Sequence, residues 1–220
     1  MTNRWGATAE EPFNLLPNFG IAVLFMPLAG REGFGPAFYD ALKDARNFGQ
    51  QDIDEAAQVV EHLIRQGYTA RDRVGITGCS YGGYFTGQSI TRYPDLYAAA
   101  NANCSLLDLT HSWEFIARPD VTYWEGRVPA SDAAEYRNDS PLFQAAKVRT
   151  PLLLVHGGRD QLPVSIVSKF RDQIAAQGTP VELLTFKDEG HGLSNPSNII
   201  AAAQAQIRWF QTYLATGDPR

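Results

Sequence analysis

Cysteine is scarce in this chain, and its scarcity excludes a disulfide-rich scaffold. Only Cys79 and Cys104 occur among 220 residues. No group of Cys and His residues has the spacing of a zinc site, so we expect no metal and interpret both cysteines as free thiols. Cys79 should point away from the side that the neighbouring Ser80 faces, and a reactive thiol needs an exposed thiolate with a base in reach. A thiol-protease interpretation is therefore disfavoured.

Long apolar runs and an excess of positive charge are also missing. The longest apolar run, from Gly20 to Gly30, falls short of the roughly 18 residues that a membrane helix needs. A formal net charge of −5 provides no basic surface for nucleic acid or for an anionic membrane. The start of the chain, MTNRWGATAEEPFN, shows no secretory signal, so we expect a cytoplasmic location. Small molecules or peptides are the expected partners, with neither nucleic acid nor membrane.

The remaining composition is that of one folded domain, taken as residues 1–220. Hydrophobic residues make up 44% of the chain, and there are no repeats. Apolar runs predict strands at 21–26, 73–77, 97–104, 151–157 and 181–186, and helical periodicity predicts helices at 51–67, 81–92, 165–178 and 198–215. This alternation predicts an α/β fold with a mostly parallel sheet flanked by helices. The weakly patterned, aromatic-rich stretch at 105–148 is expected to form a small cap-like excursion.

A serine enclosed by glycines lies between a predicted strand and a predicted helix. The run Gly78-Cys79-Ser80-Tyr81-Gly82 matches the G-x-S-x-G nucleophile elbow, whose sharp turn lifts the serine above the sheet. Glycines there allow a strained turn and a close approach of helix and strand. The bare motif is weak evidence, and Ser80 could be a small residue in a tight turn. The flanking strand and helix favour the nucleophile.

A serine hydroxyl needs a base to attack at neutral pH, and the expected order is Ser, then Asp or Glu, then His. His191 comes late in the chain and follows the predicted strand at 181–186, so it is the expected base. His62 precedes the serine within a helix, and His111 falls in the excursion. His156 ends a strand and is better explained as a structural histidine.

The acid that orients this base should come from the carboxyl end of another strand, where catalytic groups gather in parallel sheets. Asp160 lies just past the strand at 151–157 and is our choice. Asp108, after the preceding strand, is the second candidate. Asp188 is the weakest, because it lies only three residues from His191 and would have to fold back within one loop.

These residues predict an acyl-enzyme mechanism. His191 would remove the proton of Ser80 during attack on a carbonyl, and Asp160 would hold the imidazole and stabilise its charged form. The backbone N–H of Tyr81, at the start of the helix, is expected to donate to the oxyanion with the help of the helix dipole. A second oxyanion donor is needed as well.

Four segments taken together extend the argument: GCSYGGYFTG, SPL at 140–142, PLLLVHGGRDQLPV and PVELLTFKDEGHGLSNPSN. With them, the chain resembles the catalytic domain of the prolyl oligopeptidase family, most closely its acylaminoacyl-peptidase and dipeptidyl-peptidase-like members. The resemblance runs from about Gly20 to the C-terminus. It implies an α/β-hydrolase fold and places the nucleophile, acid and base of the family on Ser80, Asp160 and His191.

The resemblance also implies elements that the sequence does not show. Members of the family carry further strands before the region that matches Gly20, a His-Gly-Gly-like oxyanion loop and usually a β-propeller. One missing strand should lie between those at 21–26 and 73–77, and its absence would leave buried backbone groups unpaired. Either those two strands close up, or self-association or another chain fills the gap, or the chain is a fragment that lacks its N-terminal part. We favour the fragment.

Substrate and activity are less constrained. Trp113, Phe115, Tyr123 and Trp124 could line an apolar substrate pocket, or equally form the core of the cap. We expect a serine-type peptidase that acts on short peptides without a cofactor. One alternative is a carboxylesterase that acts on small esters. The other is a catalytically impaired or non-catalytic hydrolase scaffold, because loss of one oxyanion donor costs about 10²–10³-fold in rate.

Overall fold

The computed structural model describes residues 13–43, 49–115, 121–122 and 125–215. Its N-terminal part contains short helical turns and one long helix, before any strand begins. These elements are η1 (Leu16–Phe19), α1 (Pro36–Tyr39), η2 (Asp40–Leu42), α2 (Gln51–Arg65) and η3 (Arg71–Arg73). The long helix α2 matches the predicted amphipathic segment, with Asp52 and Asp54 in its first turn, where negative charge is favourable.

Four parallel strands form a single sheet in the order β1-β2-β3-β4. The strands are β1 (Gly75–Cys79), β2 (Ala99–Asn103), β3 (Leu152–Gly157) and β4 (Val181–Phe186). Every residue of β3 is buried, which explains why its sequence is a near-continuous apolar run. Because the strands are parallel, all four carboxyl ends lie at the same edge of the sheet. The predicted α/β class is confirmed.

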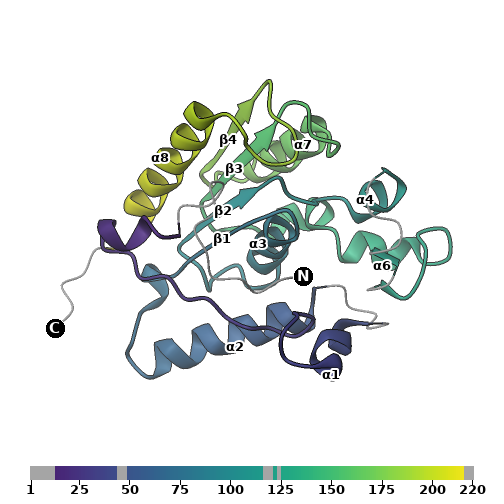
Figure 1. Ribbon diagram of the computed structural model, residues 1–220, viewed down its shortest axis with the longest axis horizontal. Coiled ribbons are helices and arrows are strands. Elements are labelled where there is room, and N and C mark those ends of the chain that lie inside the picture. The colour runs from purple at the N-terminus through teal and green to yellow at the C-terminus, as the bar shows by residue number, and fades with distance from the viewer. Residues whose placement is uncertain (1–12, 44–48, 116–120, 123–124, 216–220) are drawn as a thin grey trace.

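Helices cover both faces of this sheet (Figure 1). Helices α3 (Tyr81–Arg92) and α7 (Val164–Ala175) pack on one face, and α8 (Pro196–Tyr213) packs on the other. The predicted excursion contributes α4 (Leu109–Phe115), α6 (Ala133–Asn138) and η4 (Pro141–Lys147). This three-layer arrangement agrees with the α/β-hydrolase fold that the resemblance implies, and the cap elements lie at one side of α3.

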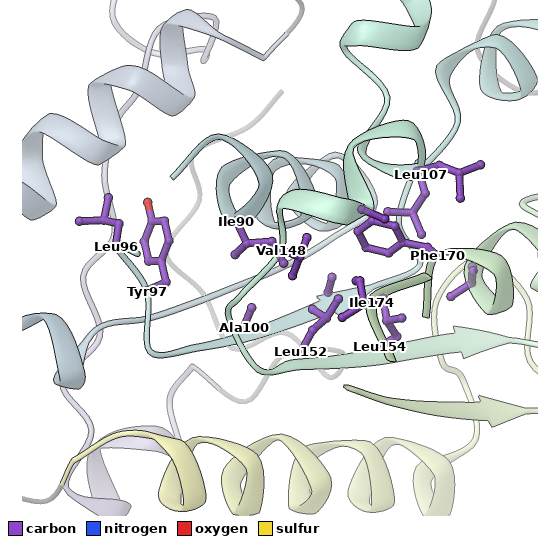
Figure 2. Packing of buried hydrophobic residues seen from close by; sticks show 14 of the residues in the cluster. Ile90, Leu96, Tyr97, Ala100, Leu107, Val148, Leu152, Leu154, Phe170 and Ile174 are labelled. Carbon is purple, nitrogen blue, oxygen red and sulfur yellow. The ribbon is translucent and has the colours of Figure 1, made fainter. Parts of the chain in front are cut away.

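The larger hydrophobic core lies between the sheet and the helices α3 and α7 (Figure 2). Ile90 from α3, Leu152 and Leu154 from β3, and Phe170 and Ile174 from α7 are all fully buried there. On the other face, Trp209 and Phe210 of α8 pack against β2 and β3 residues such as Ala99 and Leu153. These two hydrophobic cores pack on opposite faces of the sheet, and together they fix the positions of the carboxyl ends of its strands.

The strand predicted at 21–26 is wrong. Residues 21–28 carry no regular secondary structure. Ile21 and Val23 pack against the core beneath α8, but the side of the segment with Leu24 and Phe25 is exposed, at 55% and 40%. A strand needs a neighbouring ladder of hydrogen bonds, and within the described part of the chain none lies beside this segment. Its β-branched composition alone does not create a strand.

The same observation decides one of the alternatives for the sheet. The predicted closing-up of the strands at 21–26 and 73–77 does not occur, because β1 pairs only with β2 among the described residues. The outer side of β1 is therefore an edge in the part of the molecule that the structure covers. Edges of this kind expose unpaired backbone groups.

One further feature of the helices can be stated. Of the helices in the described ranges, none has the length and apolar character that would let it cross a membrane.

Candidate active site

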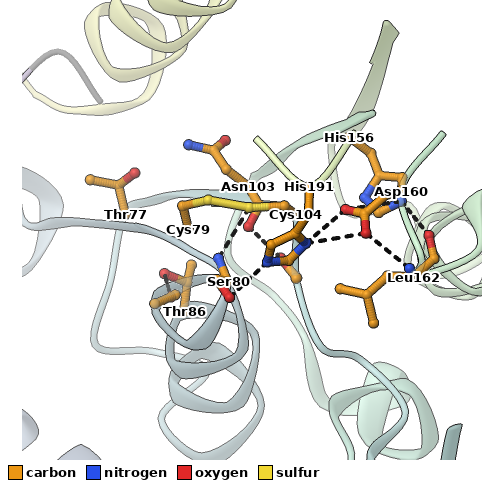
Figure 3. The surroundings of a disulfide bond; sticks show 12 residues. Thr77, Cys79, Ser80, Thr86, Asn103, Cys104, His156, Asp160, Leu162 and His191 are labelled. Atoms are coloured by element: carbon orange, nitrogen blue, oxygen red, sulfur yellow. Dashed lines mark hydrogen bonds and ion pairs between the residues drawn. A yellow bond between two sulfur atoms is a disulfide. The ribbon is translucent and has the colours of Figure 1, made fainter. Parts of the chain in front are cut away.

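Ser80 lies at the turn between β1 and α3, at the carboxyl edge of the sheet (Figure 3). Its backbone has φ 58° and ψ −115°, a conformation that is costly for a residue with a side chain and that persists only where the surroundings enforce it. The amide of Ser80 donates to the carbonyl oxygen of Asn103 at 3.1 Å and to Sγ of Cys104 at 3.2 Å. The end of β2 therefore holds this turn.

The glycines of the motif have unequal steric roles. A Cβ on Gly78 would lie 2.6 Å from the carbonyl of Gly82, so Gly78 must be glycine for the turn to close. A Cβ on Gly82 itself would meet nothing within 4 Å. A Cβ on Gly83, outside the pentapeptide, would clash with the backbone of Asn103 and with Ser105. The predicted close approach of helix and strand thus depends on Gly78 and Gly83.

His191 and Asp160 complete a chain of hydrogen bonds that begins at Ser80 (Figure 3). Nε2 of His191 lies 2.8 Å from Oγ of Ser80. Nδ1 of the same ring lies 3.0 Å from Oδ2 and 3.1 Å from Oδ1 of Asp160. This geometry can transfer a proton from the hydroxyl to the imidazole while the carboxylate holds the ring. The structure brings together all three residues predicted from the sequence.

Asp160 is held as a carboxylate. Its side chain is fully buried, and burial alone would raise its pKa. The hydrogen bond from His191 and the backbone N–H of Leu162, at 2.9 Å, outweigh burial and lower the pKa of Asp160 below its usual range. His156 fixes the same loop, since its Nε2 lies 2.7 Å from the carbonyl oxygen of Leu162. The predicted structural role of His156 agrees with this contact.

The competing acids make other contacts. Oδ1 of Asp108 accepts from the amide of His111 at 3.2 Å, within the first turn of α4. Asp188 pairs with Arg159 at 2.7 Å on the surface, where both side chains are more than two-thirds exposed. His62 is an exposed residue near the end of α2. Asp160 is the carboxylate whose hydrogen bonds to His191 the structure shows.

Comparison with known proteins identifies the family of this chain. The model of the prolyl oligopeptidase family matches residues 9–217. The chain belongs to the prolyl oligopeptidase family.

Proteins similar to this chain include an aminopeptidase, an acylamino-acid-releasing enzyme and an acylaminoacyl peptidase. Dipeptidyl aminopeptidase BIII of Pseudoxanthomonas mexicana is 31% identical over 198 residues, which cover 83% of this chain and 27% of that protein. The acylamino-acid-releasing enzyme of Rattus norvegicus is 26% identical over 211 residues, or 92% of this chain and 29% of that protein. The acylaminoacyl peptidase of Pyrococcus horikoshii superposes with a TM-score of 0.76 at 27% identity, over 88% of this chain and 32% of that one. The chain thus spans about a third or less of these proteins.

The interpretation of Cys79 and Cys104 as free thiols is wrong. The two residues form a disulfide, with their Cα atoms 5.5 Å apart and 25 positions apart in sequence. Cys79 ends β1, and Cys104 follows Asn103, the residue that pairs with Cys79 across the ladder. In this member of the prolyl oligopeptidase family, parallel pairing therefore brings the two sulfur atoms together beside Ser80.

Glu189, two residues before His191, is a residue of the candidate site that the sequence did not predict. Its buried carboxylate accepts the amides of Ser194 and Asn195, each at 2.9 Å, and Nδ2 of Asn198 at 2.7 Å. The Asn198 bond, followed by the two backbone bonds, lowers the pKa of Glu189 from 4.5 to about 2. Glu189 thus ties the loop of His191 to the start of α8. The signal was a carboxylate shortly before the Ser-Asn-Pro start of a helix.

The end of β3 touches this loop directly. A Cβ on Gly157 would clash with the carbonyl oxygens of Gly190 and Glu189, and one on Gly158 would lie 2.7 Å from that of Lys187. Gly157 and Gly158 therefore let the loop that carries His191 approach the loop that carries Asp160.

A buried ion pair supports Tyr81, the residue after Ser80. Asp52, fully buried in α2, accepts from Nη1 of Arg31 at 2.6 Å and from the hydroxyl of Tyr81 at 2.7 Å. The guanidinium of Arg31 also lies over the ring of Tyr81, 5.2 Å from its centroid. Burial, and then Asp52, raise the pKa of the Tyr81 phenol well above its usual range, so the phenol stays a neutral donor.

The predicted substrate-pocket residues are only partly described. Trp113 packs at the border of a cluster formed by buried residues of α3 and the cap, with Tyr81 at the same border. Its Nε1 donates to Oγ1 of Thr122 at 2.7 Å. Phe115 ends α4, but its side chain is outside the described part of the structure, as are Tyr123 and Trp124 entirely. A pocket role for these aromatic residues stays a prediction.

Replacement of Glu189 by Gln should weaken the loop of His191. We expect a lower Tm at pH 7 and a roughly tenfold or larger loss of serine reactivity, since a displacement of about 1 Å can cost ~10²-fold. The folded pKa is depressed, so the carboxylate stabilises the fold fully above about pH 4.5 and loses this effect as the pH falls towards 2. The difference in Tm between wild type and E189Q should therefore narrow between pH 5 and pH 3 in calorimetry. The exposed Glu182→Gln is the matched control, and a difference that is constant with pH would contradict this assignment.

Replacement of Asp52 by Asn should leave Arg31 as an uncompensated buried charge. We expect the free energy of unfolding to fall by about 3–5 kcal/mol in urea titrations, as when one partner of a buried ion pair is removed. Asp172→Asn, at an ion pair whose carboxylate side chain is 65% exposed, should change stability by less than about 0.5 kcal/mol. Equal effects at the two positions would show that the buried pair has no special weight.

Proposed function

We propose that this chain is the catalytic part of a serine peptidase that cleaves short peptides through an acyl-enzyme. The observation that supports this most is the continuous hydrogen-bonded chain from Oγ of Ser80 through His191 to Asp160, with distances of 2.8 and 3.0 Å. Membership of the prolyl oligopeptidase family and the peptidase names of its relatives agree with the proposal.

In the proposed mechanism, His191 takes the proton of Ser80 as Oγ attacks the carbonyl carbon of the scissile bond. Asp160 stays ionised because of its lowered pKa, and it stabilises the imidazolium that forms. His191 then gives this proton to the leaving amine, which departs and leaves an ester on Ser80. Water, deprotonated by His191, attacks that ester and releases the acid product.

The charge that develops on the carbonyl oxygen needs donors. We assign one donor to the backbone N–H of Tyr81, the first residue of α3, because the helix dipole points its positive end there. The Arg31–Asp52 pair fixes the side chain of the same residue. The second donor is not assigned to a residue of this chain, since by resemblance to the family it would come from a His-Gly-Gly-like loop that the sequence does not show.

Esters are the second candidate substrate class. The side chain of His191 is 37% exposed, so in the described structure the base is open to a small substrate that needs no extended binding groove. An ester is also easier to cleave than an amide, because its leaving group needs less protonation. An impaired scaffold is the third candidate, and the first experiment below separates it from the other two.

Ser80 should react with an active-serine probe. Incubation with a fluorophosphonate is expected to label the wild-type chain and not Ser80→Ala, since Oγ of Ser80 is the activated nucleophile. The measurement is in-gel fluorescence followed by mass mapping of the modified residue. Ser89→Ala is the matched control, because Ser89 is a fully buried serine of the same helix. Equal labelling of wild type and Ser80→Ala would exclude active-serine chemistry.

Turnover of peptidyl amides and simple esters should separate the two enzyme classes. For a peptidase we expect hydrolysis of short peptidyl amides, with kcat/KM lost in Ser80→Ala by a factor of about 10³ or more. The measurement is release of a chromophoric amine or alcohol at pH 7.5. Hydrolysis of esters alone would support the carboxylesterase and contradict the peptidase.

The cytoplasmic location stays a prediction of the sequence. Disulfides are commoner in oxidising compartments than in the cytosol, so the bond between Cys79 and Cys104 makes that prediction worth testing by fractionation.

A further inference from the structure

The disulfide of this chain lies directly against the nucleophile (Figure 3). Cys79 is the residue before Ser80, and Sγ of Cys104 accepts the backbone N–H of Ser80 at 3.2 Å. The same N–H also donates to the carbonyl oxygen of Asn103 at 3.1 Å. The disulfide therefore joins the end of β1 to the residue that follows β2. The relative position of these two segments determines where the backbone amide of Ser80 lies.

Both segments have backbone conformations that need support. Ser80 at φ 58° and Cys104 at φ 39° are the non-glycine residues with positive φ in the described chain. Such residues persist only where surrounding contacts enforce them. Helix α3 is already pressed against the end of β2, since a Cβ on Gly83 would meet Asn103 and Ser105. A small shift of Cys104 is therefore transmitted to the first turn of α3.

There is space next to the disulfide into which the sulfur atoms can move. A cavity of about 20 Å³ is lined by the two cysteines, by apolar residues such as Val155 and Ala202, by several polar residues and by part of the loop that carries His191. This volume is enough for one water molecule. The lining includes Asn101, His156, Gly192 and Gln206. Two thiol sulfur atoms cannot remain at the length of an S–S bond. After reduction, one of them can move into this cavity.

We propose that the Cys79–Cys104 disulfide is a positioning element of the active site, so that reaction of Ser80 depends on the oxidation state of this pair. In the oxidised chain the bond holds Sγ of Cys104 under the amide of Ser80. In the reduced chain the sulfur atoms separate, the amide loses this acceptor and Oγ of Ser80 moves relative to His191. The inference rests on the proposed serine chemistry.

The redox step requires a dithiol as reductant. A thiolate of the dithiol attacks Sγ of Cys79, the less buried cysteine, and the Cys79–Cys104 bond breaks with the electron pair leaving on Cys104. The second thiol of the reagent then attacks the mixed disulfide and releases Cys79. The protein gains two thiols, and the reagent becomes a cyclic disulfide.

The test compares the oxidised and reduced forms of the same chain. Dithiothreitol is added until thiol titration gives two thiols per chain, and the rate of fluorophosphonate labelling is measured before reduction, after reduction and after reoxidation. We expect the rate to fall about tenfold or more on reduction and to recover on reoxidation, because a displacement of about 1 Å can cost ~10²-fold. Where a peptidyl amide is turned over, kcat should fall while KM changes little.

The matched control is the double variant Cys79→Ala/Cys104→Ala, which should be labelled slowly and at the same rate with and without dithiothreitol. Near-ultraviolet circular dichroism and Tm are followed in parallel. An unchanged labelling rate in a fully reduced wild-type chain would overturn the proposal, and so would a loss of rate that only accompanies loss of tertiary structure. If the oxidised wild type is not labelled at all, the proposed function itself fails, and this inference fails with it.

Discussion

Parallel pairing of the four strands is the constraint on which the site depends. Ser80 directly follows β1, Asp160 follows β3 and His191 follows β4. His191 lies 111 positions after Ser80 and 31 positions after Asp160. They meet because parallel strands end at one edge. A strand rises about 3.3 Å per residue, so a register slip of one residue would carry a side chain farther than a hydrogen bond can stretch. The two cores pack on residues of all four strands, and they therefore help to set the 2.8 Å distance between Oγ of Ser80 and Nε2 of His191.

The loops that follow the strands position Asp160 and His191, through close approach of their backbones and through hydrogen bonds within the loops. Gly157 lets the backbone of the His191 loop touch the end of β3. Glu189 then anchors that loop to the start of α8 through several donors. Asp160 is turned towards the ring by the amide of Leu162. None of these three contacts involves Oγ of Ser80 or Nε2 of His191. Each of them restricts the positions that the His191 ring or the Asp160 carboxylate can adopt.

The parts of the fold that depend on local pattern were predictable. The helix at 81–92 and the strand at 181–186 have the predicted bounds, and the order of residues selected Ser80, Asp160 and His191. Properties that depend on a distant partner were not predictable. The segment at 21–26 has the composition of a strand without a ladder to join, and the cysteines looked free because their pairing is set by the register of β1 against β2. Glu189 was missed because its partners lie in the loop and helix that follow it.

Ser80 is held from several directions by residues outside its own motif. Asn103 and Cys104 accept its amide, and the Arg31–Asp52 pair holds the side chain of Tyr81 next to it. These contacts stabilise a backbone conformation that a free turn would leave. A G-x-S-x-G pentapeptide can occur in any tight turn, since Gly82 is not required sterically here. What distinguishes Ser80 from a serine in an ordinary tight turn is this set of partners, which constrain both its own amide and the side chain of the residue after it.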